Sequence, residues 1–262
     1  MLTHAQFGWT VFGLLCAIAV LAAVWIAFRL AFAKGEPEPF LTWVKKGADA
    51  AARTGNHCGV LEVIKDTELE NAVIELVDES CEDGLPHTVD ADRIRMTNTV
   101  WNGDRREDIL RHERIHLLQR RDPLAWRQFY KEKWGYTDFT RTAPPGVGDG
   151  QHGGAVMRSN PDTDDSPWAC WGNRYWFVPV YRDLKNPKIR DTETRVWDAR
   201  LGLWSDPPRE WVSFFCEEGR CPHQLEHPHE ISAEVLSDTK DPWKTPAARL
   251  LREFQQNLSP ES

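Results

Sequence analysis

Three residues close together in the sequence, His112, Glu113 and His116, have the types and spacing needed to bind and use a metal ion. On a helix, His112 and His116 lie one turn apart on the same face, so both imidazoles can reach one cation. Zn²⁺ binds neutral imidazole, and in catalytic sites it keeps one position open for water. Glu113 lies beside the two histidines and can take a proton from that water. The pattern therefore predicts a zinc-dependent hydrolase with Glu113 as the general base.

A third protein ligand must come from elsewhere in the chain. The residues after His116 lack the Gly-x-x-His of the metzincins, which excludes that class. Sites with two histidines and one glutamate are the remaining expectation, and Glu230 and Glu234 lie one turn apart in a second predicted helix. The alternative interpretation is an amphipathic surface helix whose two histidines bind no metal.

Two segments together resemble the gluzincin clan of zinc metallopeptidases: His112-Glu113-x-x-His116 and Glu230-x-x-Ala233-Glu234. The resemblance implies a zincin-like α+β domain with a small sheet and two active-site helices. It also implies one Zn²⁺ per chain, held by His112, His116 and Glu230, with Glu234 orienting a zinc-bound histidine. The reverse assignment of Glu230 and Glu234 stays open.

One residue departs from this clan. Arg114 is charged where the family usually has an uncharged residue, which bears on how deeply the first helix is buried. The resemblance covers only the two helices. Two further functions therefore stay open, a zincin-like binding or assembly protein without turnover and a hydrolase of a non-peptide amide or ester.

Several other residues near these segments are candidates for chemistry. Four side chains are candidate donors to a developing oxyanion or to substrate, although a purely structural role is favoured for each: His227, His229, Tyr175 and Tyr181. Cys216 and Cys221 are expected to form a disulfide or remain free thiols. A second, structural zinc held by these cysteines with His223, His227 and His229 is the less favoured alternative. Arg158 and the Asn160-Pro161-Asp162 turn either line the cleft or form a capped turn, and the turn is favoured.

The elements that position the motif follow from hydrophobic periodicity and turn signals. Helices are predicted over residues 105–121 and 124–134, after His229, and over residues 245–257, with a short helix within residues 40–52. Strands are predicted at residues 73–77, 93–96, 174–181 and 194–204. Residues 143–165 are rich in Pro, Gly, Asp and Asn and predict an extended loop. Thirteen Trp and seventeen Pro disfavour an all-helical fold.

The N-terminal segment differs from the rest of the chain. Residues 7–28 carry no charged side chain and are long enough to cross a bilayer, which predicts a single transmembrane anchor within residues 1–33. The main alternative is a signal peptide cleaved near Ala33, after Ala31-Phe32-Ala33, and a buried core helix is the third. A linker over residues 34–39 then leads into the catalytic domain, residues 40–262.

The distribution of charge limits which compartment and which partners are expected. Four basic residues follow the apolar stretch, so the positive-inside tendency predicts a single-pass membrane protein with a cytosolic domain: Arg29, Lys34, Lys45 and Lys46. Cleavage near Ala33 would instead give a secreted or lumenal protein. The net charge of -8 argues against nucleic acid as a partner. The expected partners are a peptide or protein substrate and, through residues 7–28, the membrane.

Overall fold

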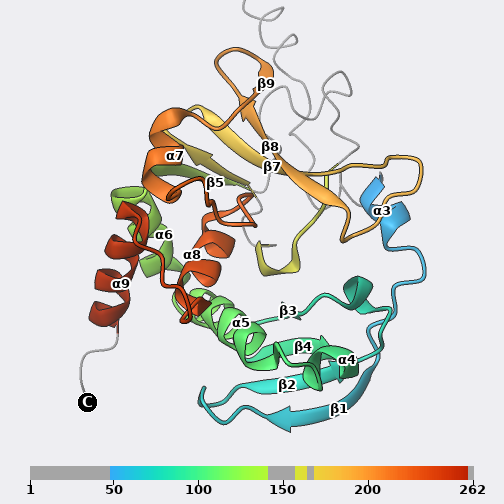
Figure 1. Ribbon diagram of the computed structural model, residues 1–262. Helices are drawn as coiled ribbons and strands as arrows, with labels where there is room; N and C mark the ends of the chain where they lie inside the picture. Colours follow the sequence, from blue (N-terminus) through green and yellow to red (C-terminus); the bar gives the residue numbers. More distant parts are fainter. Residues whose placement is uncertain (1–47, 141–156, 164–167, 259–262) are drawn as a thin grey trace, which may run out of the picture. The chain divides into compact units, whose positions relative to one another are not determined.

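A computed structural model describes residues 48–140, 157–163 and 168–258, which form an α+β domain with two sheets (Figure 1). The domain therefore belongs to the α+β class, as predicted. The prediction of a single small sheet is wrong, because the structure has two sheets. The prediction of a transmembrane helix in front of the domain is corrected. No helix in the described part is long and apolar enough to cross a membrane, and the predicted span, residues 7–28, lies outside it.

The first sheet comes from the N-terminal part of the domain. Its strand order is β1-β2-β4-β3, with β2 and β4 parallel and the other pairs antiparallel. The strands are β1 (Val60–Lys65), β2 (Val73–Val77), β3 (His87–Thr88) and β4 (Arg93–Thr97), with η1 (Cys81–Gly84) before β3 and α4 (Asn98–Trp101) after β4. The predicted strands at 73–77 and 93–96 are confirmed as β2 and β4. Apolar side chains of β2 and β4 pack against α5, which covers this sheet.

Two helices follow the first sheet, as predicted. α5 (Arg106–Arg121) carries the His-Glu-x-x-His segment, and α6 (Pro123–Lys133) follows it directly. Asp122 caps α6 by accepting a hydrogen bond from the Ala125 N–H, and Pro123 occupies the first helical position, where no N–H is needed. Leu110 and Leu117 of α5 belong to the core under the first sheet, whereas Ile115 belongs to the larger core on the other side. α5 therefore lies between the two cores.

The second sheet is an antiparallel meander in the order β5-β6-β7-β8-β9. Its strands are β5 (Tyr136–Thr140), β6 (Trp168–Trp171), β7 (Tyr175–Tyr181), β8 (Thr192–Asp198) and β9 (Leu203–Ser205). The predicted strand at 174–181 is confirmed as β7, but the one at 194–204 is two strands. Asp198 makes the turn between them, because its carboxylate accepts the N–H groups of Arg200 and Leu201.

An aromatic core lies between the second sheet and the C-terminal helices α7 (Arg209–Phe215), α8 (Pro228–Ser237) and α9 (Pro246–Leu258). It holds the completely buried tryptophans of α6, of α7 and of the segment before α9, so much of the Trp content serves packing. The predicted helix after His229 is confirmed as α8, and the terminal helix as α9. α3 (Ala48–Ala52) is the described part of the short helix predicted within residues 40–52.

Two disulfides are present, Cys58–Cys81 and Cys216–Cys221, and Cys170 is a buried free thiol. Cys216 and Cys221 close the small loop that the sequence allowed. Both sulfurs are part of this disulfide and cannot serve as thiolate ligands. The alternative of a second, structural zinc held by Cys216 and Cys221 is therefore not supported.

Candidate metal centre

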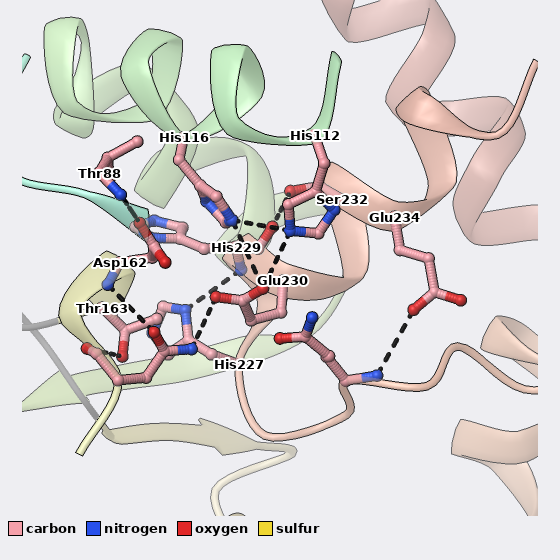
Figure 2. Close-up of polar contacts among 12 residues, drawn as sticks. Thr88, His112, His116, Asp162, Thr163, His227, His229, Glu230, Ser232 and Glu234 are labelled. Carbon is pink, nitrogen blue, oxygen red and sulfur yellow. Dashed lines mark hydrogen bonds and ion pairs between the residues drawn. The ribbon is translucent and has the colours of Figure 1, made fainter. Parts of the chain in front are cut away.

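His112, His116 and Glu230 converge on one point between α5 and α8 (Figure 2). The two Nε2 atoms are 3.0 Å apart, and Oε2 of Glu230 lies 3.3 Å from His112 Nε2 and 3.4 Å from His116 Nε2. Ligands at about 2.0 to 2.1 Å from a tetrahedral Zn²⁺ are separated from one another by about 3.3 Å. The three atoms therefore form a triangle of the size of one face of a zinc tetrahedron, with the opposite vertex left for water.

The two helices bring these ligands together by packing side by side (Figure 1). His112 and His116 share one face of α5 because they are one turn apart. α8 begins at Pro228, and His227 caps it by accepting a hydrogen bond from the His229 N–H through its ring Nδ1. Glu230 is consequently in the first turn of α8, and its side chain reaches the two histidines.

Gln119 fixes the ring of His116. Its Nε2 donates to the His229 carbonyl (3.0 Å) and to Ser232 Oγ (2.8 Å), so its Oε1 must accept from His116 Nδ1, 2.8 Å away. When the ring is neutral, as a metal ligand must be, the proton therefore sits on Nδ1 and leaves the lone pair of Nε2 for the metal. Gln119 was not singled out in the sequence, although its position three residues after His116 places both on one helix face.

Asn160 orients Glu230, the third residue of the candidate ligand set. Its Nδ2 donates to Oε1 of Glu230 at 2.7 Å, leaving Oε2 directed at the histidines. The preceding residue, Ser159, is held by the buried Asp49 of α3, whose carboxylate accepts from the Ser159 N–H and hydroxyl. The Asn160-Pro161-Asp162 segment, η3 (Pro161–Thr163) included, is thus a capped turn, as favoured, and part of the site as well.

Asp162, for which the sequence favoured a role in a capped turn over one in the cleft, adds a carboxylate beside the metal cluster. Its Oδ1 accepts from the Thr88 N–H at 2.7 Å and from the Thr88 hydroxyl at 2.5 Å. Ligand atoms of Glu113, His116 and Asp162 lie within 4.8 Å of one another. Segments separated widely in sequence, β3 and η3, therefore bring a further negative charge beside α5.

The electrostatics of the cluster suit a cation. Burial lowers the pKa of His116, but the carboxylates of Glu230 and Asp162 outweigh this and raise it to about 10. Burial raises the pKa of Glu230, yet the charge on His116 and the hydrogen bond with His112 hold it well below its usual value. Burial, reinforced by the charge of Asp162, raises the pKa of Glu113 well above its usual value. A dication would relieve the repulsion among these carboxylates.

Glu113 itself has an orphan oxygen. Its side chain is only 4% exposed, and Oε2 has no hydrogen-bond partner among the described residues. A buried carboxylate oxygen without a partner is strongly unfavourable, so a donor such as a water molecule is expected to meet it. Glu113, His112 and Glu230 line one cavity of about 880 Å³, which has room for water beside them. The residues present therefore fit a catalytic zinc with its water.

Glu234 is placed differently from the expectation. Its carboxylate accepts from the backbone N–H of His223 at 2.7 Å and lies 2.8 Å from the His223 ring. It lines the cavity, but the side chain that contacts a ligand histidine is Gln119. Of the two glutamates, Glu230 is the one beside His112 and His116.

The four candidate oxyanion donors are all outside the cavity lining. His227 is completely buried as the cap of α8, and the ring of His229 packs between Tyr130 and His227. Burial lowers the pKa of His229 well below its usual value, so this imidazole is neutral. Tyr181 donates to Asp49 at 2.6 Å, and Tyr175 lies under the guanidinium of Arg174.

The contacts of Arg114 account for a charged residue at this position, where the gluzincin clan usually has an uncharged one. Its side chain turns away from the metal cluster and binds Asp66 (3.0 Å) and Glu68 (2.7 Å) in the turn between β1 and β2. The charge is therefore neutralised on the face of α5 opposite to the ligands. Burial of α5 is compatible with an arginine at this position.

No protein-family model matches the chain, and neither a curated protein nor a solved structure matches it. The function has to be argued from the site.

Proposed function

We propose that this protein is a zinc-dependent hydrolase, and specifically a peptidase. The observation that carries the proposal is the triangle of His112 Nε2, His116 Nε2 and Glu230 Oε2, together with a buried Glu113 oxygen that has no partner among the described residues. The gluzincin resemblance supports a peptide bond as the scissile group. A cavity of about 880 Å³ accommodates a stretch of several residues, since small-ligand sites measure about 300 to 1,000 Å³.

Each residue has a definite task in this reaction. His112, His116 and Glu230 would hold Zn²⁺, with Gln119 and Asn160 keeping His116 and Glu230 in orientation. Bound zinc supplies Lewis acidity, which acidifies a water molecule and polarises the substrate carbonyl. Glu113 takes one proton from the attacking water and delivers it to the nitrogen of the leaving amine. The C–N bond breaks, a C–O bond forms, and the products are a carboxylate and an amine.

The first test is metal content. We expect elemental analysis of the purified chain to find one zinc per molecule, and the His112→Ala variant to lose it. Absence of zinc in the wild type after reconstitution would contradict the proposal and favour the metal-free amphipathic helix.

The second test separates binding of zinc from catalysis. Glu113→Gln should keep the zinc but lose hydrolysis of a casein digest by at least about a hundredfold, because the general base is gone. Glu107→Gln, an exposed position on the same helix, is the matched control and should retain activity. Full activity in Glu113→Gln would refute the mechanism. A zinc-loaded wild type that cleaves an ester or acetylated amine but no peptide would replace the peptidase with a hydrolase of another amide or ester.

A further inference from the structure

Among the strands that the structure describes, β8 has a partner along its whole length on one side only. β7 pairs with all of β8, from Thr192 to Asp198. β9 pairs only with the last three residues of β8, beginning at Val196. On the β9 side, the first half of β8 therefore has no neighbouring strand within the described part of the chain.

The backbone groups that point to this open side can be identified. Pro179 of β7 has no N–H, and its carbonyl accepts from the Arg158 N–H, away from β8. Pro179 and its partner Thr194 are therefore a pair without mutual hydrogen bonds, and the N–H and C=O of Thr194 point away from β7. Two residues earlier, Thr192 points the same way. Neither residue's N–H or C=O has a hydrogen bond to another described backbone group.

This open edge belongs to the same cavity as the metal cluster. Thr192, Glu193 and Thr194 line it together with His112, Glu113 and Glu230. The hydroxyl of Thr194 donates to Glu226 at 3.4 Å, and Glu226 precedes Glu230 by four residues, in the segment that leads into α8. An extended chain on this edge would therefore lie in the same cavity as the three ligands.

The other strand edge near α5 is already filled. β3 has β4 on one side. On its other side, the Thr88 N–H is taken by Asp162, and the Thr88 carbonyl accepts from Arg120 at 3.4 Å. A substrate would have to displace Asp162 to add a strand there. Of the two edges, only that of β8 presents to the cavity backbone groups that no described residue satisfies.

We infer that the substrate binds in an extended conformation as an additional strand on β8, hydrogen-bonded to Thr192 and Thr194, with its scissile carbonyl at the metal cluster. The inference rests on the proposed function. Main-chain pairing of this kind supplies affinity that is independent of substrate sequence, whereas alternate side chains face pockets. Proline or an N-methylated residue at a paired substrate position should be rejected.

Thr194→Pro is the decisive variant, because it removes the outward N–H without removing a hydrogen bond between β7 and β8. Thr194→Ala keeps the N–H and measures what the side chain alone contributes. With zinc content equal in both, we expect KM for a cleaved peptide to be about five- to tenfold higher in Thr194→Pro than in Thr194→Ala, with similar kcat. Circular dichroism and thermal unfolding check that both variants fold.

A second measurement does not depend on turnover or on a proline variant. In zinc-loaded Glu113→Gln, we expect a casein digest to slow hydrogen exchange of the Thr192 and Thr194 amides. The Lys65 amide on β1 of the other sheet serves as the internal reference.

The outcomes separate this inference from the proposed function. If peptides are cleaved but KM is equal in the two Thr194 variants, substrate binding at the β8 edge is refuted and the peptidase activity is retained. The same conclusion follows if peptides are cleaved but hydrogen exchange of the Thr192 and Thr194 amides is unchanged. Slowed exchange without cleavage by the wild type overturns the peptidase and keeps the edge as a peptide-binding surface. Neither cleavage nor slowed exchange overturns both.

Discussion

At the scale of single residues, Gln119 connects the metal cluster to the core of the domain. Its amide is completely buried and bridges His116, Ser232 and the backbone of α8. Replacing it by Leu removes the acceptor of the His116 Nδ1 proton, so the ring loses its fixed tautomer. We expect zinc affinity of Gln119→Leu to fall by about ten- to a hundredfold, measured by competition with a chromogenic chelator.

The controls for this prediction are close in structure. Gln119→Glu keeps an acceptor for His116 and should retain more of the affinity than Leu does. Gln128→Leu, at an exposed position on α6, should leave it unchanged. Wild-type zinc affinity in Gln119→Leu would mean that packing alone orients His116.

Site residues can be recognised in the sequence when the residues that they act with are close in the sequence. His112, Glu113 and His116 are recognised because a single helical turn relates them. Glu230 was found through a second helix with a family-like spacing. Asn160 and Asp162 reach the site only through tertiary structure, since their partners Glu230 and Thr88 are 70 and 74 residues away. No periodicity encodes such contacts.

At the scale of elements, the ion pair between α5 and the β1–β2 turn holds the ligand helix to the first sheet. Asp66 is completely buried, accepts the N–H groups of Glu68 and Leu69, and receives the guanidinium of Arg114. Arg114→Met removes that guanidinium and leaves a buried carboxylate with only its backbone donors. We expect the free energy of unfolding to fall by about 2 to 3 kcal/mol, measured by urea denaturation.

A double-mutant cycle isolates this pair from the general effect of each substitution. Asp66→Asn and the double variant Asp66→Asn/Arg114→Met complete the cycle, and the coupling should be about 1 kcal/mol or more. Arg106→Met, whose guanidinium makes an exposed pair on the same helix, is the control and should change stability by less than about 0.5 kcal/mol. Additive effects within the cycle would show that Arg114 stabilises α5 only by packing.

The predicted helices and the missed strands differ in how local their signals are. α5, α6 and α9 were predicted because caps, proline and apolar spacing lie within each helix. β1 was missed because its sequence lacks the alternation of apolar and polar residues that marks a half-buried strand. Its apolar residues Leu61 and Val63 are exposed rather than directed into a core. β3 is two residues long and exists only through its pairing with β4. Strands of this kind depend on partners remote in sequence.

At the scale of the whole chain, the two disulfides bear on the compartment. The basic residues after the apolar stretch predicted a cytosolic domain, and that stays a prediction. Disulfides, however, persist in oxidising compartments and are rare in the cytosol. We therefore expect protein isolated from its own cells to contain both bonds, which non-reducing peptide mapping by mass spectrometry would detect as two linked peptide pairs. Free thiols at all four of these cysteines would instead favour the cytosol.

The two bonds should also differ in their effect on stability, because the loops that they close differ in length. Cys58–Cys81 spans 23 residues and ties the segment before β1 to η1, whereas Cys216–Cys221 spans only 5. On chain entropy alone, the longer loop contributes about 3 kcal/mol and the shorter about 2 kcal/mol. We expect Cys58→Ser/Cys81→Ser to lower the free energy of unfolding more than Cys216→Ser/Cys221→Ser does, measured by urea denaturation without reductant.

The shorter bond has a second effect, because its loop leads through His223 to Glu234 and then along α8, the helix that carries Glu230. Loosening this loop should weaken the position of α8 relative to α5. Cys216→Ser/Cys221→Ser is therefore expected to lower zinc affinity more than Cys58→Ser/Cys81→Ser does, which is the reverse of their order in stability. Parallel losses of stability and zinc affinity across the two variants would show that the disulfides act only on the fold as a whole.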